Sequence, residues 1–269
     1  MTLALPDGEI TFRFDIAAGE NAILPFGLML GGARLDWATA QPLAHVGSAW
    51  FFLVPDGMTP VYCLNGQTVK AAPGEAFTVA GQTIMTLSRR DSLNFWVYED
   101  TAYLCEKPLL WDGERLSVEV DGSGADVLIW RETEKRFVPR FHAESACPPD
   151  SLAAEKVGID RYAIGIPSEA LRGHKQVLLR ARYQGDIGSA FVRGQLISDN
   201  FCNGDFWDIR LDCHADALAR EPLTLYIAPT RKNVTVDTSA MAGLIEKADI
   251  EESKILSLQL ITVDDVPVK

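Results

Sequence analysis

The stretch YQGDIGSAFVRGQLISDNFCNGDFWDIRL, residues 183–211, alternates short apolar runs with residue pairs that form tight turns. Arg193-Gly194 separates two strand-like runs, and Asn203-Gly204 comes between the second run and a third. Two-residue turns of this kind need positive φ, which Gly and Asn tolerate but which is unfavourable for Arg193. The stretch therefore predicts two successive hairpins between antiparallel strands.

The last run of this stretch, FWDIRL at residues 206–211, alternates between two faces. Trp207, Ile209 and Leu211 share one face, and Phe206, Asp208 and Arg210 share the other, as in a strand with one buried side. We therefore interpret Trp207 first as a core residue, with a ligand platform as the alternative.

The same period-two alternation recurs along the chain, in segments 10–16, 115–120, 176–183, 223–229 and 255–263. Turn-forming pairs occur at Asp7-Gly8, Asp56-Gly57, Asn65-Gly66, Asp112-Gly113 and Asp121-Gly122. Half-buried strands joined by short turns are typical of antiparallel sheets. The sequence contains too few helical segments for a βα-repeat, so a (β/α)8 barrel and a doubly wound sheet are both excluded.

Two segments have helical features, Ser145–Val157 and Ser239–Lys254. Prolines 139, 148 and 149, which flank polar residues, indicate a domain boundary around residues 139–150. We therefore expect an all-β protein with two β-sandwich or jelly-roll domains, antiparallel strands and one or two short helices. The first β-sandwich covers residues 1–140, and a jelly-roll, galactose-binding-like domain covers residues 141–269.

The composition limits the classes of partner. The 269 residues carry a formal net charge of −12, and no Lys/Arg-rich run interrupts this acidity. Such a chain repels phosphate backbones and anionic lipid surfaces, so neither nucleic acid nor a membrane is expected as a partner. The amino end lacks the pattern of a secretory signal, which leads us to expect a cytoplasmic location unless the chain is part of a longer one.

Reactive motifs are scarce in the sequence. The five cysteines, at positions 63, 105, 147, 202 and 213, have no CxxC spacing and are interpreted as buried free thiols. There is no Gly-rich phosphate loop, Gly-x-Ser-x-Gly or HExxH motif. No cofactor is expected. An EF-hand is rejected because Phe201 and Arg210 occupy ligand positions, although a structural calcium site built from distant loops stays open.

Five polar and aromatic residues of the 183–211 stretch are the candidates for carbohydrate contact: Asp199, Asn200, Asn203, Asp205 and Trp207. An aromatic platform with a few oriented polar groups is the usual composition of a sugar site. Asp199, Asp205 and Asp208 could also supply the carboxyl pair of a glycosidase. Aspartates beside glycine more often form turns, so no residue is assigned a catalytic role.

Two regions of the chain resemble a known family. ILPFGLMLGGARLDWATAQPL at residues 23–43, followed by WFFLVPDGMTP at 50–60, looks like the β-rich region that follows the catalytic barrel in β-galactosidases of glycoside hydrolase family 35. The 183–211 stretch resembles the jelly-roll, galactose-binding-like domain of those enzymes, and LTLYIAP at 223–229 is similar to its closing strand. The resemblance extends from about residue 22 to about residue 230.

The resemblance implies an accessory role. The catalytic glutamates of the family lie on a (β/α)8 barrel that this chain lacks, so no catalytic residue can be transferred. The chain would be a non-catalytic β-sandwich region that supports a barrel in cis or in trans and contacts a β-galactoside-like carbohydrate. The alternative is a stand-alone carbohydrate-binding protein, and a small β-sandwich glycosidase or lyase is the third hypothesis.

Overall fold

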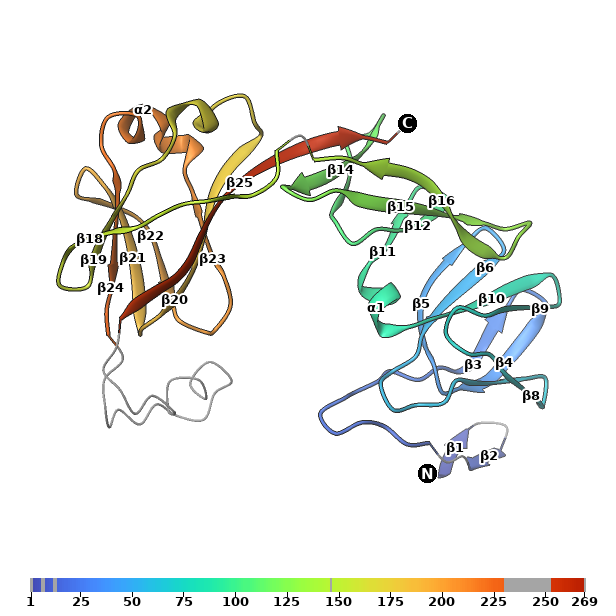
Figure 1. Ribbon diagram of the computed structural model, residues 1–269. Helices are drawn as coiled ribbons and strands as arrows, with labels where there is room; N and C mark the ends of the chain where they lie inside the picture. Colours follow the sequence, from blue (N-terminus) through green and yellow to red (C-terminus); the bar gives the residue numbers. More distant parts are fainter. Residues whose placement is uncertain (1, 6–7, 12–13, 146, 230–252, 269) are drawn as a thin grey trace. The chain divides into compact units, whose positions relative to one another are not determined.

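The computed structural model describes residues 2–5, 8–11, 14–145, 147–229 and 253–268 (Figure 1). Strands dominate and helical segments are short, so the predicted all-β class is confirmed. The chain divides into two compact units, Met1–Leu116 with Ala125–His142 and Lys269, and Ser117–Gly124 with Ala143–Val268. In the described part, no helix has the length and apolar character that a membrane crossing requires.

The first unit contains three four-stranded sheets and one isolated strand pair. The pair is β1 (Thr2–Leu5) and β2 (Gly8–Thr11); one sheet has the order β3 (Phe26–Leu30), β4 (Ala33–Ala38), β7 (Val61–Leu64) and β8 (Gln67–Lys70). A second sheet has the order β5 (Gln41–Val46), β6 (Ala49–Leu53), β10 (Gln82–Leu87) and β9 (Ala76–Val79). The third has the order β11 (Phe95–Tyr98), β12 (Thr101–Leu104), β15 (Ala125–Arg131) and β16 (Arg136–Ala143). Helix α1 (Arg89–Leu93) and β13 (Leu109–Trp111) complete the unit. Strand β10 runs parallel to β6, in contrast to the antiparallel pairing expected throughout.

Aromatic side chains fill the first unit's core in two clusters. In one cluster, Phe52 meets Tyr62 edge-on with ring centres 5.3 Å apart. The Tyr62 hydroxyl lies 2.9 Å from that of Thr86, and burial raises the pKa of Tyr62. In the other cluster, Phe51 packs edge-on against Trp130 at 5.1 Å. Edge-to-face packing at these distances is favourable beyond the apolar area that it buries.

The second unit is a β-sandwich. One sheet contains β14 (Leu116–Asp121), β25 (Lys254–Pro267), β20 (Gln176–Gln184) and β23 (Trp207–Arg210), with β17 (Asp150–Ser151) paired to β25. The other has the order β18 (Glu155–Gly158), β19 (Arg161–Ile164), β24 (Leu223–Ile227), β21 (Ile187–Val192) and β22 (Gln195–Phe201). Short helical turns η1 (Ser168–Leu171), η2 (Asp212–His214) and α2 (Ala215–Leu218) connect them. Both sheets contribute to one core, which includes Leu179, Ile209 and Leu225.

The predicted helix over residues 145–157 is wrong. In its described residues, 145 and 147–157, strand β17 pairs with β25, β18 begins at Glu155, and the backbone N–H of Leu152 donates to Leu258. Proline disfavours a helical conformation in the residue before it, and here the neighbouring strand satisfies the backbone groups. Of the second predicted helix, residues 239–252 lie outside the described part, and Lys254 begins β25.

Two other local predictions need correction. Strand β2 ends at Thr11; of the expected strand over residues 10–16, residues 12–13 are outside the described part and 14–16 are not strand. The hairpin at Arg193-Gly194 is confirmed, because Val192 pairs with Gln195 and both turn residues have positive φ, 53° and 73°. The hairpin at Asn203-Gly204 is wrong, because β22 pairs with β21 whereas β23 pairs with β20 in the opposite sheet.

Strand β23 is seated against the core through Trp207. Its ring packs edge-on against Tyr183, with ring centres 5.8 Å apart. A Cβ atom at Gly188 would lie only 2.6 Å from the Cζ3 atom of Trp207. The absence of a side chain at Gly188 therefore makes the space into which the indole fits.

Replacing Gly188 with alanine should destabilise the second unit by about 2 kcal/mol, because overpacking of a closely packed core forces ring and backbone to shift. Gly165→Ala is the matched control, since a Cβ there has no atom within 4 Å. Urea denaturation of both variants and the wild type measures the difference. An equal stability of the two variants would contradict this account of Gly188.

Replacing Arg193 with asparagine should stabilise the protein by about 0.5–1 kcal/mol, because Asn tolerates the left-handed conformation better than Arg does. The lost contact between Arg193 and Glu221, at 3.6 Å with both side chains about half exposed, contributes little. Thermal and urea unfolding test the change. A loss of stability would show that the side chain of Arg193 matters more than its φ.

Candidate functional site

The structure distributes the predicted carbohydrate-contact residues over different environments. Trp207 is buried, and its indole N–H donates to the Ser198 hydroxyl at 3.0 Å. Because the indole ring packs against Tyr183 and its N–H is hydrogen-bonded inside the sandwich, Trp207 presents no free ring face for stacking on a sugar. Trp207 is therefore a core residue, as the alternation in the sequence indicated.

Asn200 is half-buried and belongs to the hydrogen-bond network of Tyr183. The Tyr183 hydroxyl donates to the Asn200 carbonyl at 2.8 Å and accepts from the Asn200 side-chain amide and the Gly188 N–H, both at 3.1 Å. Burial raises the pKa of Tyr183, which keeps its hydroxyl protonated as the network requires. The network links β20, β21 and β22 and leaves Asn200 committed to structure.

The remaining three predicted residues are exposed. Asp199 lies on β22, whereas Asn203 and Asp205 lie in the connection between β22 and β23. The Asn203 side chain accepts from the Asp205 N–H at 3.0 Å, and the Asp205 carboxylate accepts from the Phe206 N–H at 2.8 Å. These contacts shape the loop that leads into β23, and both side chains remain accessible.

The outer face of the β20–β23 pair carries a group of residues that we call the Phe206 surface: Arg180, Arg182, Phe206 and Asp208. The guanidinium carbons of Arg180 and Arg182 lie 5.7 Å and 5.9 Å from the centre of the Phe206 ring. The side chain of Phe206 is nevertheless 50% exposed. Such cation–π distances hold the arginine side chains beside the ring.

Asp208 orders this surface. Its carboxylate accepts two hydrogen bonds from the Arg180 guanidinium, both at 2.8 Å, which is a bidentate ion pair. The hydrogen bond that Arg180 donates to Asp208 raises the pKa of Arg180, and the Asp121 carboxylate lies 3.7 Å from the same guanidinium. The register places Arg180 opposite Asp208 across the two strands. Arg180 is thereby fixed, while Arg182 has no carboxylate within ion-pairing distance among the described residues.

The Phe206 surface combines the groups that bind polyhydroxylated ligands. An exposed ring offers an apolar face, and adjacent guanidinium and carboxylate groups offer donors and acceptors for hydroxyls. The sequence alternation already placed Phe206 on the outer face with Asp208. The arginines come from a strand more than 20 residues away, so no local pattern could assign them to the same surface.

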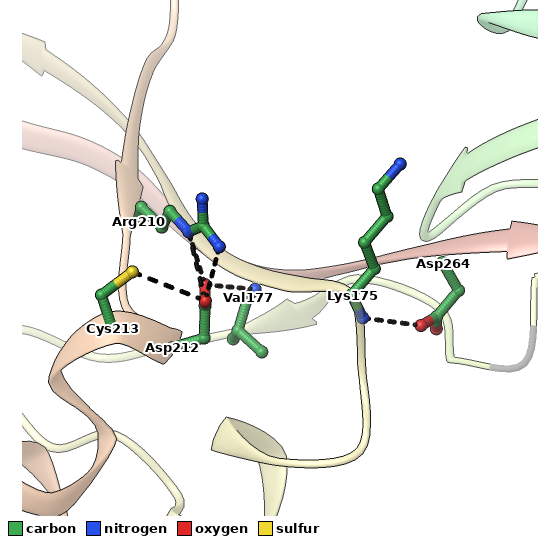
Figure 2. Close-up of polar contacts among 6 residues, drawn as sticks. All are labelled: Lys175, Val177, Arg210, Asp212, Cys213 and Asp264. Atoms are coloured by element: carbon green, nitrogen blue, oxygen red, sulfur yellow. Dashed lines mark hydrogen bonds and ion pairs between the residues drawn. The ribbon is translucent and has the colours of Figure 1, made fainter. Parts of the chain in front are cut away.

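Two further carboxylates hold the start of β20, as Figure 2 shows. Asp264 accepts from the Lys175 backbone N–H at 3.2 Å, and Asp212 accepts from the Val177 backbone N–H at 3.1 Å. Asp212 also receives the Arg210 guanidinium at 2.9 Å. These contacts satisfy backbone donors at the point where the strand begins, which indicates a structural role.

Cysteine and metal chemistry have little support in the described residues. All five cysteines are free; Cys63 and Cys105 are buried as predicted, whereas Cys147 and Cys202 are half-buried and Cys213 is exposed. The Cys213 thiol donates to the Asp212 carboxylate at 3.7 Å. In the described part of the chain, no group of three or more His, Cys, Asp or Glu side chains is placed to hold a metal ion.

The fold and the Phe206 surface define an all-β protein with an exposed aromatic and charged patch on one sandwich. Neither a protein-family model nor a curated protein matches the chain. The similarity to family 35 β-galactosidases thus remains an expectation from the sequence.

Replacing Asp212 with asparagine should cost about 1 kcal/mol of stability at pH 7, since a charged hydrogen-bond acceptor is lost. Burial acts to raise the pKa of Asp212, but the hydrogen bonds from Arg210 and Val177 outweigh it and the pKa is lowered. The contribution is therefore present above the ordinary aspartate pKa and disappears as the pH falls through the lowered value.

Urea unfolding of wild type and Asp212→Asn between pH 7 and pH 2 tests this dependence. The stability difference should shrink below about pH 4. Asp216→Asn is the control, because the Asp216 side chain is 87% exposed and its pair with Arg172 lies on the surface. A difference that stays constant with pH would contradict the role given to the Asp212 charge.

Proposed function

We propose that this chain is a non-catalytic β-sandwich protein that contacts a carbohydrate through the Phe206 surface of its second unit. One observation carries the proposal: a half-exposed aromatic ring lies beside two guanidinium groups, and one of these is held in place by a carboxylate. A pyranose ring could stack on Phe206 while its hydroxyls bond to Arg182 and to the loop carboxylate of Asp205.

The proposal refines the expectation from the sequence. The sugar platform moves from Trp207, whose ring is buried, to its neighbour Phe206, while Asp205 is kept as a polar contact. The net charge of −12 does not oppose a neutral ligand such as a β-galactoside. Asp208 is engaged by Arg180 and serves to position that guanidinium, which is why we assign it no catalytic role.

The resemblance to family 35 suggests that the chain works beside a catalytic (β/α)8 barrel in cis or in trans. The stand-alone carbohydrate-binding protein is the alternative, and it uses the same surface. The mass of the native polypeptide in cytoplasmic extracts of its source cells shows whether a barrel is attached in cis and also tests the expected location. A band near 29.5 kDa supports the stand-alone protein or a barrel in trans, whereas one of about twice that mass supports a covalently attached barrel.

Replacing Phe206 with alanine should weaken the binding of galactose or galacto-oligosaccharides at least tenfold, about 1.4 kcal/mol, because the stacking face is removed. Calorimetric titration of the purified chain into the millimolar range measures it. Phe201→Ala is the matched control, since Phe201 is an equally prominent ring, 62% exposed, but lies on β22 in the other sheet.

Three outcomes would contradict the proposal. A flat titration of the wild type would remove the carbohydrate function, and an equal loss in Phe201→Ala would remove the assignment to the Phe206 surface. Release of nitrophenol from a nitrophenyl β-galactoside at an enzyme-like rate, abolished by Asp208→Asn, would show that the chain is catalytic.

A further inference from the structure

The first unit has a cleft of about 490 Å³, formed by residues of β12, β15 and β16 and of the turn after β5. Its polar lining consists of Asp100, Thr101, Tyr103, Arg131, Glu132 and Arg140. Binding sites for small molecules usually measure about 300–1,000 Å³, so the cleft has room for a monosaccharide or a disaccharide. We call it the first-unit cleft.

Strand pairing brings these side chains together. Tyr103 on β12 pairs with Ile129 on β15 in antiparallel register. Thr101 lies two residues before Tyr103 on β12, and Arg131 lies two residues after Ile129 on β15. Because the strands are antiparallel, these two residues lie on the same face of the sheet as Tyr103 and Ile129. Asp100 lies in the turn that precedes β12, and Arg140 lies on β16, the strand next to β15. The cleft is therefore built on regular strands and on the short turns that contain Gly47, Asp100 and Glu132 rather than on long loops.

The two arginines of the cleft are available for a ligand. Among the described residues, neither Arg131 nor Arg140 has a carboxylate within ion-pairing distance. Glu132, which also lines the cleft, already accepts a hydrogen bond from the Ser48 hydroxyl. In a protein with a net charge of −12, two guanidinium groups that face one cleft without an ion pair indicate an anionic partner.

We propose that the first-unit cleft binds a sugar acid, such as a hexuronate. The guanidinium forks of Arg131 and Arg140 match the geometry of a carboxylate. The hydroxyls of Thr101 and Tyr103, together with the Asp100 carboxylate, match the donors and acceptors of the sugar hydroxyls. A ligand with a single anionic group also avoids the repulsion that a polyanion would meet from Asp100 and Glu132. This site lies in a different unit from the Phe206 surface and requires a different ligand.

The experiment titrates D-galacturonate, D-galactose and inorganic phosphate calorimetrically into three forms of the full chain. The forms are the wild type, Arg131→Gln/Arg140→Gln and Arg136→Gln. Arg136 is the matched control because it lies on the same strand as Arg140, pairs with Glu134 at 2.7 Å and does not line the cleft. Circular dichroism checks that each variant is folded.

The proposal expects galacturonate to bind the wild type and Arg136→Gln equally, and the double variant at least tenfold more weakly. Galactose should bind the wild type at least tenfold more weakly than galacturonate does. Phosphate that binds as tightly as galacturonate would reduce the cleft to a simple anion site and overturn the assignment to a sugar acid. Equal affinity for galactose, or no galacturonate binding in the millimolar range, would also overturn it, even if the double variant failed to fold.

Discussion

The second unit depends on the pairing of β20 with β25. Each residue of β20 from Gln176 to Gln184 has a partner in β25, although the two strands are far apart in the sequence. The same β25 pairs with β14 on its other side and with β17, so one long strand joins segments from three regions of the chain. On the inner face, Leu179 of β20 and Leu258 of β25 enter a shared core. Such nonlocal pairing is stable only when the whole apolar face is buried at once.

Alternation in the sequence predicted the strands and their buried faces well. Val118 and Val120, Leu179 and Ala181, and Leu223 and Leu225 are all buried, as their spacing indicated. Alternation says nothing about partners, however, because both sheets of a sandwich face one core. This ambiguity explains why β23, with a correct inner face, was paired with β22 in the prediction and with β20 in the structure. The parallel β6–β10 pair was not predicted either, because no local turn in the sequence specifies which strands pair.

The candidate site shows the same limit. Asp199 and Asp205 are exposed and therefore accessible to a ligand, and Phe206 was already assigned to the outer face. Its neighbours Arg180 and Arg182 are contributed by pairing between strands, which sequence alone did not reveal. Asn200 had the right chemistry for a sugar contact, but the Tyr183 hydroxyl engages its amide. Polar residue types near turns therefore identify a region, while long-range register decides which side chains share a surface.

The core and the proposed binding surface are two faces of one strand pair. Trp207 enters the space left by Gly188, and this contact fixes where β23 lies against β20. The same register then places Asp208 opposite Arg180 and brings Phe206 beside both guanidinium groups. A slip of one residue would exchange the inner and outer side chains, burying a charged pair and exposing the indole. The cost of that exchange keeps the ring and the guanidinium groups in a constant arrangement, which is the preorganisation that a weak ligand such as a sugar requires.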